Sequence, residues 1–358
     1  MKPSPLVEFY PSTTVFREIG DAKVPRTFTS LDDEHNAIRT SCALLDLSGN
    51  GGLRITGPGA NALVQAATAR DIEYLFPERC LTTLVLGEDA GIVDLVTVYR
   101  ESDGFLLESS VGRSSDLHAL LKSLDVGEEV AINPVADAMF IGIEGPTAWE
   151  WIGKTIGIEV TGLPFQGVMA ASVEGEPALV ARTGATGEFG YKVHLPLDAA
   201  KALWSRLAAE VTPTGYDALE IAMLEVRQPN LHAEGADQAD AITCGFNWMA
   251  EPTKSGFIGR DALLAQFESN AVRTIGFEID ASVPDVPGPG TPVKLGEVEV
   301  GTVVLARRVP GAGRVLGLAR VSADLAVSQL PIEVGDGVAA RTISSPYTIP
   351  TSWSVSIV

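Results

Sequence analysis

Asp94 is the residue whose position in the sequence most needs a chemical explanation. It opens an otherwise apolar run that continues to Tyr99 and has the composition of a buried strand. Burying a lone carboxylate costs several kcal/mol, so Asp94 must be paired, hydrogen-bonded or placed in a cleft. The structural alternative is a strand-end cap or a salt bridge. Asp94 is therefore the candidate catalytic residue.

A glycine-rich segment and a helix end supply further candidates. Gly184, Gly187 and Gly190 lie between two expected strands, which predicts a hairpin whose backbone can approach a flat ligand or form a plain turn. This segment brings Glu188, Tyr191 and Lys192 as candidate ligand contacts. Glu225 and Arg227 end a predicted helix, and Asn230 and His232 follow, at a kind of position where ligands often bind.

Arg307 and Arg314 belong to a run, residues 301–322, that contains four arginines and no acidic residue. In so acidic a chain this run predicts a local positive surface, and an anionic ligand is one reason for it. Four solvated arginines on strands are the equally weighted alternative.

Three other kinds of site receive little support. The sequence Gly57-Pro58-Gly59-Ala60-Asn61-Ala62 matches a dinucleotide fingerprint, but proline removes a backbone N–H that would hold a phosphate. No G-x-S-x-G elbow accompanies the serines near His118. The four histidines and three cysteines lack the spacing of metal ligands, so no metal is expected.

Composition restricts the possible partners. The chain has 358 residues, 26 basic and 46 acidic side chains, a formal charge of -20 and 46% apolar residues. That balance argues against nucleic acid and anionic membranes as partners. Three widely spaced cysteines, no apolar N-terminal segment and no window long enough to span a membrane predict a cytoplasmic protein. The sequence leaves the oligomeric state open.

The elements that must position these residues alternate between short strands and amphipathic helices, which predicts an α+β fold. Strands are expected at 53–56, 82–86, 92–99, 105–108, 139–143, 178–182 and 191–195, and helices at 35–42, 60–69, 114–124, 147–152, 199–209, 216–227 and 260–267. Gly57-Pro58 and Gly145-Pro146 both follow a strand and precede a helix, which indicates two related units. After about residue 270 the pattern becomes that of a small β domain.

The order of these motifs resembles the aminomethyltransferase family, the glycine cleavage T-protein and its folate-dependent relatives. The matching segments run from about residue 34 to 265: Glu34 to Arg39, Leu45 to Ser48, Gly57-Pro58, Glu88 to Asp94, Gly145-Pro146, Ala181 to Gly190, Leu224-Glu225 and Phe257 to Leu263. The resemblance implies a three-part cloverleaf around a central channel, with a catalytic region of two interleaved α+β subdomains at 1–270 and a β-barrel at 271–358. It also implies tetrahydrofolate as cofactor, with Asp94 near the N10 atom and the arginine-rich run near the anionic tail.

The chain departs from the family at residues that contact the pterin. Ala185 and Lys192 replace a tyrosine and a glutamate, Leu219 replaces an arginine, and Leu95 replaces the second acid of an Asp-Asp pair. An ammonium is donor-only and cannot accept the pterin N–H bonds. The resemblance therefore predicts one-carbon transfer from or to a small substrate other than glycine, for instance by a demethylase.

Two alternatives remain open. One is a folate-independent enzyme that uses Asp94 and a channel remodelled around Lys192 for acid-base chemistry on a small anionic substrate. The other is a non-catalytic binding protein, which the costly burial of Asp94 disfavours.

Overall fold

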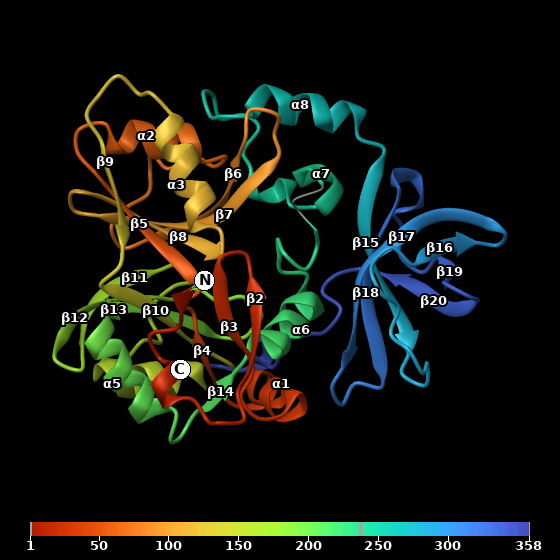
Figure 1. Ribbon diagram of the computed structural model, residues 1–358, viewed down its shortest axis with the longest axis horizontal. Helices are drawn as coiled ribbons and strands as arrows, with labels where there is room; N and C mark the ends of the chain where they lie inside the picture. The colour runs from red at the N-terminus through yellow and green to blue at the C-terminus, as the bar shows by residue number, and fades with distance from the viewer. Residues whose placement is uncertain (1, 236–238, 358) are drawn as a thin grey trace.

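The computed structural model describes residues 2–235 and 239–357 and contains three parts (Figure 1). A five-stranded sheet has the order β6-β7-β8-β5-β9, a six-stranded sheet has the order β11-β12-β13-β10-β4-β14, and β15 to β20 close into a barrel. The predicted α+β class and the three-part arrangement are confirmed. Within the described residues no helix has the length and apolarity needed to cross a membrane.

The first sheet packs its two helices on one face. Its strands are β5 (Asn50–Thr56), β6 (Cys80–Leu86), β7 (Ile92–Glu101), β8 (Gly104–Val111) and β9 (Ala131–Val135), and its helices are α2 (Ala60–Ala67) and α3 (Ser114–Ser123). Leu53 and Ile55 of β5 pack with Leu63 of α2 and Leu117 of α3 in one buried cluster. The opposite face of this sheet is not covered by these two helices and is free to pack against another part of the fold.

The second sheet is built in a similar way. It consists of β4 (Ala43–Asp46), β10 (Ala138–Glu144), β11 (Val168–Val173), β12 (Glu176–Ala181), β13 (Gly190–Pro196) and β14 (Thr212–Thr214), and its helices are α4 (Ala148–Ile156) and α5 (Leu197–Leu207). Trp204 and Tyr191 are completely enclosed in the core between this sheet and α5. The remaining faces of the two sheets meet through a shared cluster that includes Tyr99, Leu106 and Phe140.

The two predicted Gly-Pro turns have the same geometry. Gly57 has φ 102° and precedes α2, and Gly145 has φ 140° and precedes α4. A side chain at Gly145 would approach the carbonyl oxygen of Ser41 to 2.5 Å, and one at Gly57 would approach that of Glu129 to 2.9 Å. Each turn therefore requires glycine for its backbone conformation and for close packing.

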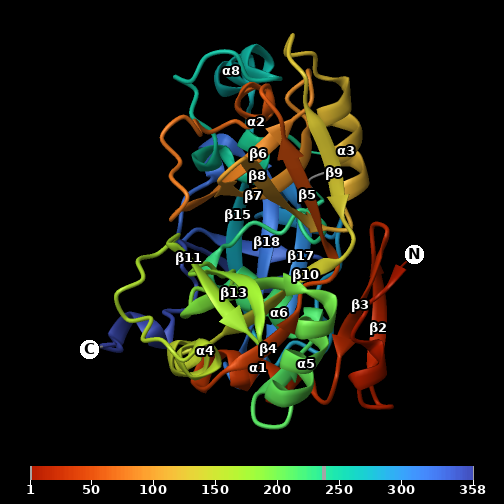
Figure 2. The same cartoon turned by 90° about the vertical axis from the view of Figure 1, so that its left-hand side faces the viewer.

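Two further groups of elements border the sheets. The N-terminal strands β1 (Lys2–Pro3), β2 (Val15–Ile19) and β3 (Ala22–Thr27) form a small sheet that the sequence did not predict. Helices α1 (Leu31–Thr40) and α6 (Tyr216–Val226) pack against each other, and α6 also contacts β3, which lies with β2 at the edge of the molecule in Figure 2. Helices α7 (Ala241–Cys244) and α8 (Arg260–Ser269) lead into the barrel.

The barrel consists of β15 (Val272–Asp280), β16 (Pro292–Leu295), β17 (Val298–Val309), β18 (Arg314–Ser322), β19 (Pro331–Val334) and β20 (Val338–Ile343). These strands lie within the predicted range 271–358. After β20 the chain returns to the second sheet, where the backbone of Thr351 and Ser352 is bound by Glu188. The C-terminal segment is therefore packed against the second sheet.

Candidate functional site

One cavity lies where the two sheets meet α6. Its volume is about 150 Å³, and side chains from β4, β7, β8, β13, α6 and the segment 228–232 line it. The walls combine apolar side chains with a few polar groups, as in ligand sites generally. The lining includes Leu45, Asp46, Asn50, Leu95, Glu108, Ser109, Ser110, Glu144, Ala185, Lys192, Tyr216, Leu219, Met223, Asn230 and His232.

Lys192 is paired with a carboxylate that sequence reasoning missed. Its Nζ lies 2.7 Å from Oε1 and 2.8 Å from Oε2 of Glu108, across the cavity on β8. Glu108 also accepts hydrogen bonds of 2.8 Å from Asn50 Nδ2 and from the hydroxyl of Tyr99. These contacts occupy the acceptor positions of the carboxylate, and the pair itself carries no net charge.

Asp94 lies behind the cavity wall. It is completely buried, and alternation along β7 places Leu95, not Asp94, among the lining residues. Its carboxylate accepts a 2.5 Å bond from Ser109 Oγ and bonds from the backbone N–H groups of Leu95 and Ser110 at 2.7 and 3.1 Å. Burial raises the pKa of Asp94 to about 7, although these hydrogen bonds oppose the rise. Asp94 therefore does not touch the cavity itself, and its contact with the cavity is indirect, through lining residues to which it is hydrogen-bonded.

Two other carboxylates line the cavity. Glu144 accepts from the backbone N–H groups of Ala185 and Thr186 at about 3.0 Å and from the Thr186 hydroxyl at 2.7 Å, so it holds the glycine-rich segment in place. A side chain at position 184 would approach Glu144 Oε2 to 2.8 Å, and this close packing explains why residue 184 is a glycine. Burial raises the pKa of Glu144. Asp46 accepts from the Tyr10 hydroxyl and from the Ser48 N–H.

The cavity lining also contains an unpaired donor. Asn230 is 6% exposed, and its Oδ1 accepts from the Ala233 N–H at 3.2 Å and the Tyr216 hydroxyl at 3.4 Å. Its Nδ2 has no hydrogen-bond partner among residues 2–235 and 239–357. His232 binds the carbonyl oxygen of Val111 through Nε2, and burial lowers its pKa.

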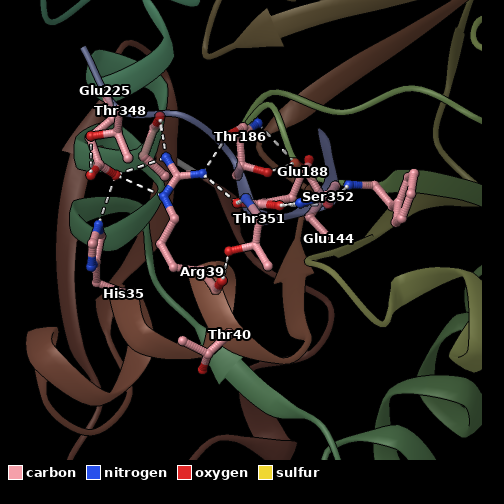
Figure 3. Close-up of polar contacts among 12 residues, drawn as sticks. His35, Arg39, Thr40, Glu144, Thr186, Glu188, Glu225, Thr348, Thr351 and Ser352 are labelled. Carbon is pink, nitrogen blue, oxygen red and sulfur yellow. Dashed lines mark hydrogen bonds and ion pairs between the residues drawn. The ribbon is translucent and has the colours of Figure 1, made fainter. Parts of the chain in front are cut away.

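Glu188 and Glu225, both predicted as ligand contacts, instead surround Arg39 (Figure 3). Arg39 donates to Glu225 Oε2 at 2.8 and 2.9 Å and to Glu188 Oε1 at 3.1 Å. His35 Nε2 lies 2.8 Å from Glu225, and Ser352 donates to Glu188 through N–H and hydroxyl. This cluster ties α1, α6 and the glycine-rich segment to the C-terminal segment, and its two glutamates do not line the cavity.

Tyr191 and Arg227 also lie outside the cavity. Tyr191 alternates with Lys192 along β13 and is therefore buried in the core on the other face of the sheet. Arg227 has a left-handed backbone conformation at the end of α6, and its guanidinium pairs with Glu234 at 2.8 Å and donates to the Cys244 carbonyl oxygen at 2.6 Å. Its contacts fix the chain after α6.

The arginine-rich run forms structural contacts. Arg307 pairs with Glu220 of α6 at 2.5 Å, which joins the barrel to that helix. Arg314 donates to the Tyr347 carbonyl oxygen at 2.6 Å and to the Thr348 hydroxyl at 2.9 Å. Neither lines the cavity, so of the residues predicted to contact the cofactor, the structure brings together only Lys192 and Leu219 there.

Several cavity residues were missed although the sequence contains a hint of them. Glu108, Ser109 and Ser110 interrupt the apolar end of a strand, which is the same kind of feature that marks Asp94. Their importance depends on partners in distant segments, and spacing along one strand does not reveal these.

The comparisons with known proteins agree with this architecture. Residues 9–254 match the family model described as the GCVT N-terminal domain. An aminomethyltransferase of Geobacillus kaustophilus is 30% identical over 92% of this chain and 93% of its own length, and one of Listeria monocytogenes is 28% identical over 97% and 95%. The crystal structure of glycine cleavage system aminomethyltransferase T from Bartonella henselae has the same fold, with a TM-score of 0.87, 21% identity and 98% coverage of both chains. The chain therefore belongs to the aminomethyltransferase family and is an enzyme of that family.

Proposed function

We propose that this enzyme is a tetrahydrofolate-dependent one-carbon transferase whose substrate is a small molecule other than glycine. The observation that carries the proposal is the pairing of Lys192 with Glu108. A free ammonium in the cavity would favour an anionic ligand, whereas Glu108 neutralises the ammonium of Lys192. A neutral ring with hydrogen-bonding edges, such as a reduced pterin, suits such a cavity.

The remaining lining residues fit a flat heterocycle. Leu95 and Leu219 contribute apolar walls, and Asp46 and Glu144 contribute carboxylate acceptors. The unpaired Nδ2 of Asn230 is a buried donor, and leaving it without a partner costs about 1–3 kcal/mol. A ligand with a carbonyl oxygen or ring nitrogen at that position would remove this cost.

These residues suggest roles in holding the cofactor and substrate. Asn230 would donate to an acceptor on the ring, Asp46 would accept from a ring N–H, and the leucines would exclude water. When bound, tetrahydrofolate supplies the nitrogen atoms that exchange the one-carbon unit. We therefore retain tetrahydrofolate as the proposed cofactor. Its contacts at positions 185, 192 and 219 would differ from those that the family resemblance implies.

We infer a substrate other than glycine from the cavity residues Leu95, Lys192 and Glu108. Leu95 places a hydrocarbon group where the resemblance implies a second acid, and Lys192 with Glu108 replaces a single glutamate. These changes alter charge and hydrogen bonding where the reacting groups would meet. With a hydrocarbon group at Leu95 in place of an acid, small N-methyl or O-methyl compounds are the substrate class that we infer.

Calorimetric titration with tetrahydrofolate tests the proposal. We expect binding in the micromolar to low millimolar range and formation of a one-carbon tetrahydrofolate, detected by mass spectrometry, when N-methyl or O-methyl compounds are added. Absence of binding up to millimolar ligand would refute it. Lys192→Glu provides a further test, since turnover of an anionic substrate that depends on Lys192, without folate, would establish the folate-independent alternative instead.

A further inference from the structure

Ser109 occupies the position between the cavity and the buried carboxylate of Asp94. Ser109 lies on β8, lines the cavity and is 1% exposed, and its Oγ is 2.5 Å from Asp94 Oδ2. A hydroxyl both donates and accepts, so it can bond to Asp94 on one side and to a cavity ligand on the other. Asp94 itself has no place in the lining, because Leu95 takes that position.

The rest of the Asp94 environment directs its chemistry towards Ser109. Oδ1 is occupied by the backbone N–H groups of Leu95 and Ser110, which leaves Oδ2 for the serine hydroxyl. Close by in the chain, Arg113 donates to the carbonyl oxygen of Val93, the residue before Asp94. Burial gives Asp94 a pKa of about 7, so both of its protonation states are accessible near neutral pH.

We propose, building on the proposed function, that Ser109 is a catalytic residue that passes a proton between the bound molecule and Asp94. In the forward direction, an N–H or O–H bond of the ligand breaks, its electron pair stays on the ligand atom, and the proton goes to Ser109 Oγ. The original Ser109 hydroxyl proton moves to Asp94 Oδ2, which becomes a neutral carboxylic acid. The reverse sequence returns the proton. Asp94 then acts as the proton store and as a positioning residue for Ser109.

Ser123 offers a control for this role. It lies on α3, outside the cavity lining, and its exposed hydroxyl donates to the Leu120 carbonyl oxygen at 2.7 Å. Ser123→Ala therefore removes a serine hydroxyl and leaves the Ser109 hydroxyl bonded to Asp94.

The first experiment measures kcat against pH with tetrahydrofolate and a methyl-donor substrate. Loss of general acid-base catalysis typically costs about 10²–10⁴-fold in rate, so Ser109→Ala should lower kcat by at least about 100-fold and abolish the inflection near neutral pH. Ser109→Thr, which keeps a hydroxyl, should restore much of the rate, and Ser123→Ala should keep both the rate and the inflection. A Ser109→Ala variant with the kcat and pH profile of the original enzyme would overturn the proposal.

The second experiment needs neither cofactor nor turnover. Infrared difference spectroscopy follows the protonation of Asp94, assigned by its loss in Asp94→Asn. Removing the Ser109 hydroxyl takes away a donor that favours the carboxylate, so Ser109→Ala should shift the titration to higher pH, and Ser123→Ala should leave it unchanged. An unchanged titration in Ser109→Ala would overturn the coupling. If tetrahydrofolate fails to bind, the proposed function falls, while this titration still decides whether Ser109 and Asp94 share a proton.

Discussion

Lys192 on β13 and Glu108 on β8 join the two sheets across the cavity, with Nζ 2.7 and 2.8 Å from the two carboxylate oxygens. The side chains are 14% and 2% exposed, so water screens the pair only weakly. The same contact therefore holds two units of the fold together and sets the charge of the site. A change at either residue should affect both stability and ligand preference.

We expect Lys192→Met and Glu108→Gln each to destabilise the protein by about 3–5 kcal/mol, because each leaves its former partner buried without compensation. The double variant Lys192→Met/Glu108→Gln should lose less than the sum of the two. Urea unfolding of the four proteins measures this coupling. Arg206→Ala breaks an exposed pair with Glu174 and should cost only about 0–1 kcal/mol. Additive effects of the first two changes would contradict the prediction.

Most of the regular elements could be predicted because their patterns are local. The helix over Ala60–Ala67 and the strand over Ile92–Glu101 follow from apolar periodicity and from the Gly-Pro turn that precedes the helix. The strands at Val15–Ile19 and Ala22–Thr27 were missed since their residues are mixed in polarity and the second contains proline. Short β4 was missed because three apolar residues do not define a period.

The site was harder to predict than the fold. Asp94 was singled out correctly as a buried carboxylate, but which face of β7 points to the cavity depends on how the two sheets pack. Lys192 was expected to present its positive charge, while its partner Glu108 lies 84 residues away in the sequence. Glu225 and Arg314 are polar residues at element ends, and there the sequence does not distinguish a ligand contact from a structural one.

Arg39 should prove important for the attachment of the C-terminal segment. We expect Arg39→Met to destabilise the protein by about 3–5 kcal/mol, because Glu188 and Glu225 both lose a buried cationic partner. Amide exchange at Thr351 and Ser352, whose N–H groups bind Glu188, should also become faster. Hydrogen-exchange mass spectrometry checks this. Arg341→Met, which breaks a more exposed pair on the barrel, should leave that exchange unchanged.

Asn230 provides a test of how the cavity holds its ligand. Asn230→Asp keeps an oxygen for the Ala233 N–H but replaces the unpaired Nδ2 donor with an acceptor. We expect tetrahydrofolate to bind at least about tenfold more weakly, which corresponds to about 1.4 kcal/mol. Calorimetry measures the affinity, and Asn61→Asp, at an exposed position that accepts from Arg100, should leave it unchanged. Equal or tighter binding by Asn230→Asp would show that the ligand presents a donor at this position.

Glu225 should make stability depend on pH in the acidic range. Burial by itself would raise its pKa, but the hydrogen bond from His35 and the charge of Arg39 together outweigh burial and lower the pKa below the usual 4.5. The unfolded chain then binds a proton at higher pH than the folded chain, so the stability contributed by Glu225 is complete above about pH 4.5 and is lost as the pH falls through the folded-state value. Glu225→Gln should accordingly be less stable than the original protein near neutral pH, and the difference should shrink as the pH falls below about 4.5. Urea unfolding of both proteins across this range measures it, with the exposed Glu176→Gln as control. A difference that stays constant across the acidic range would mean that the carboxylate charge of Glu225 contributes nothing to folding.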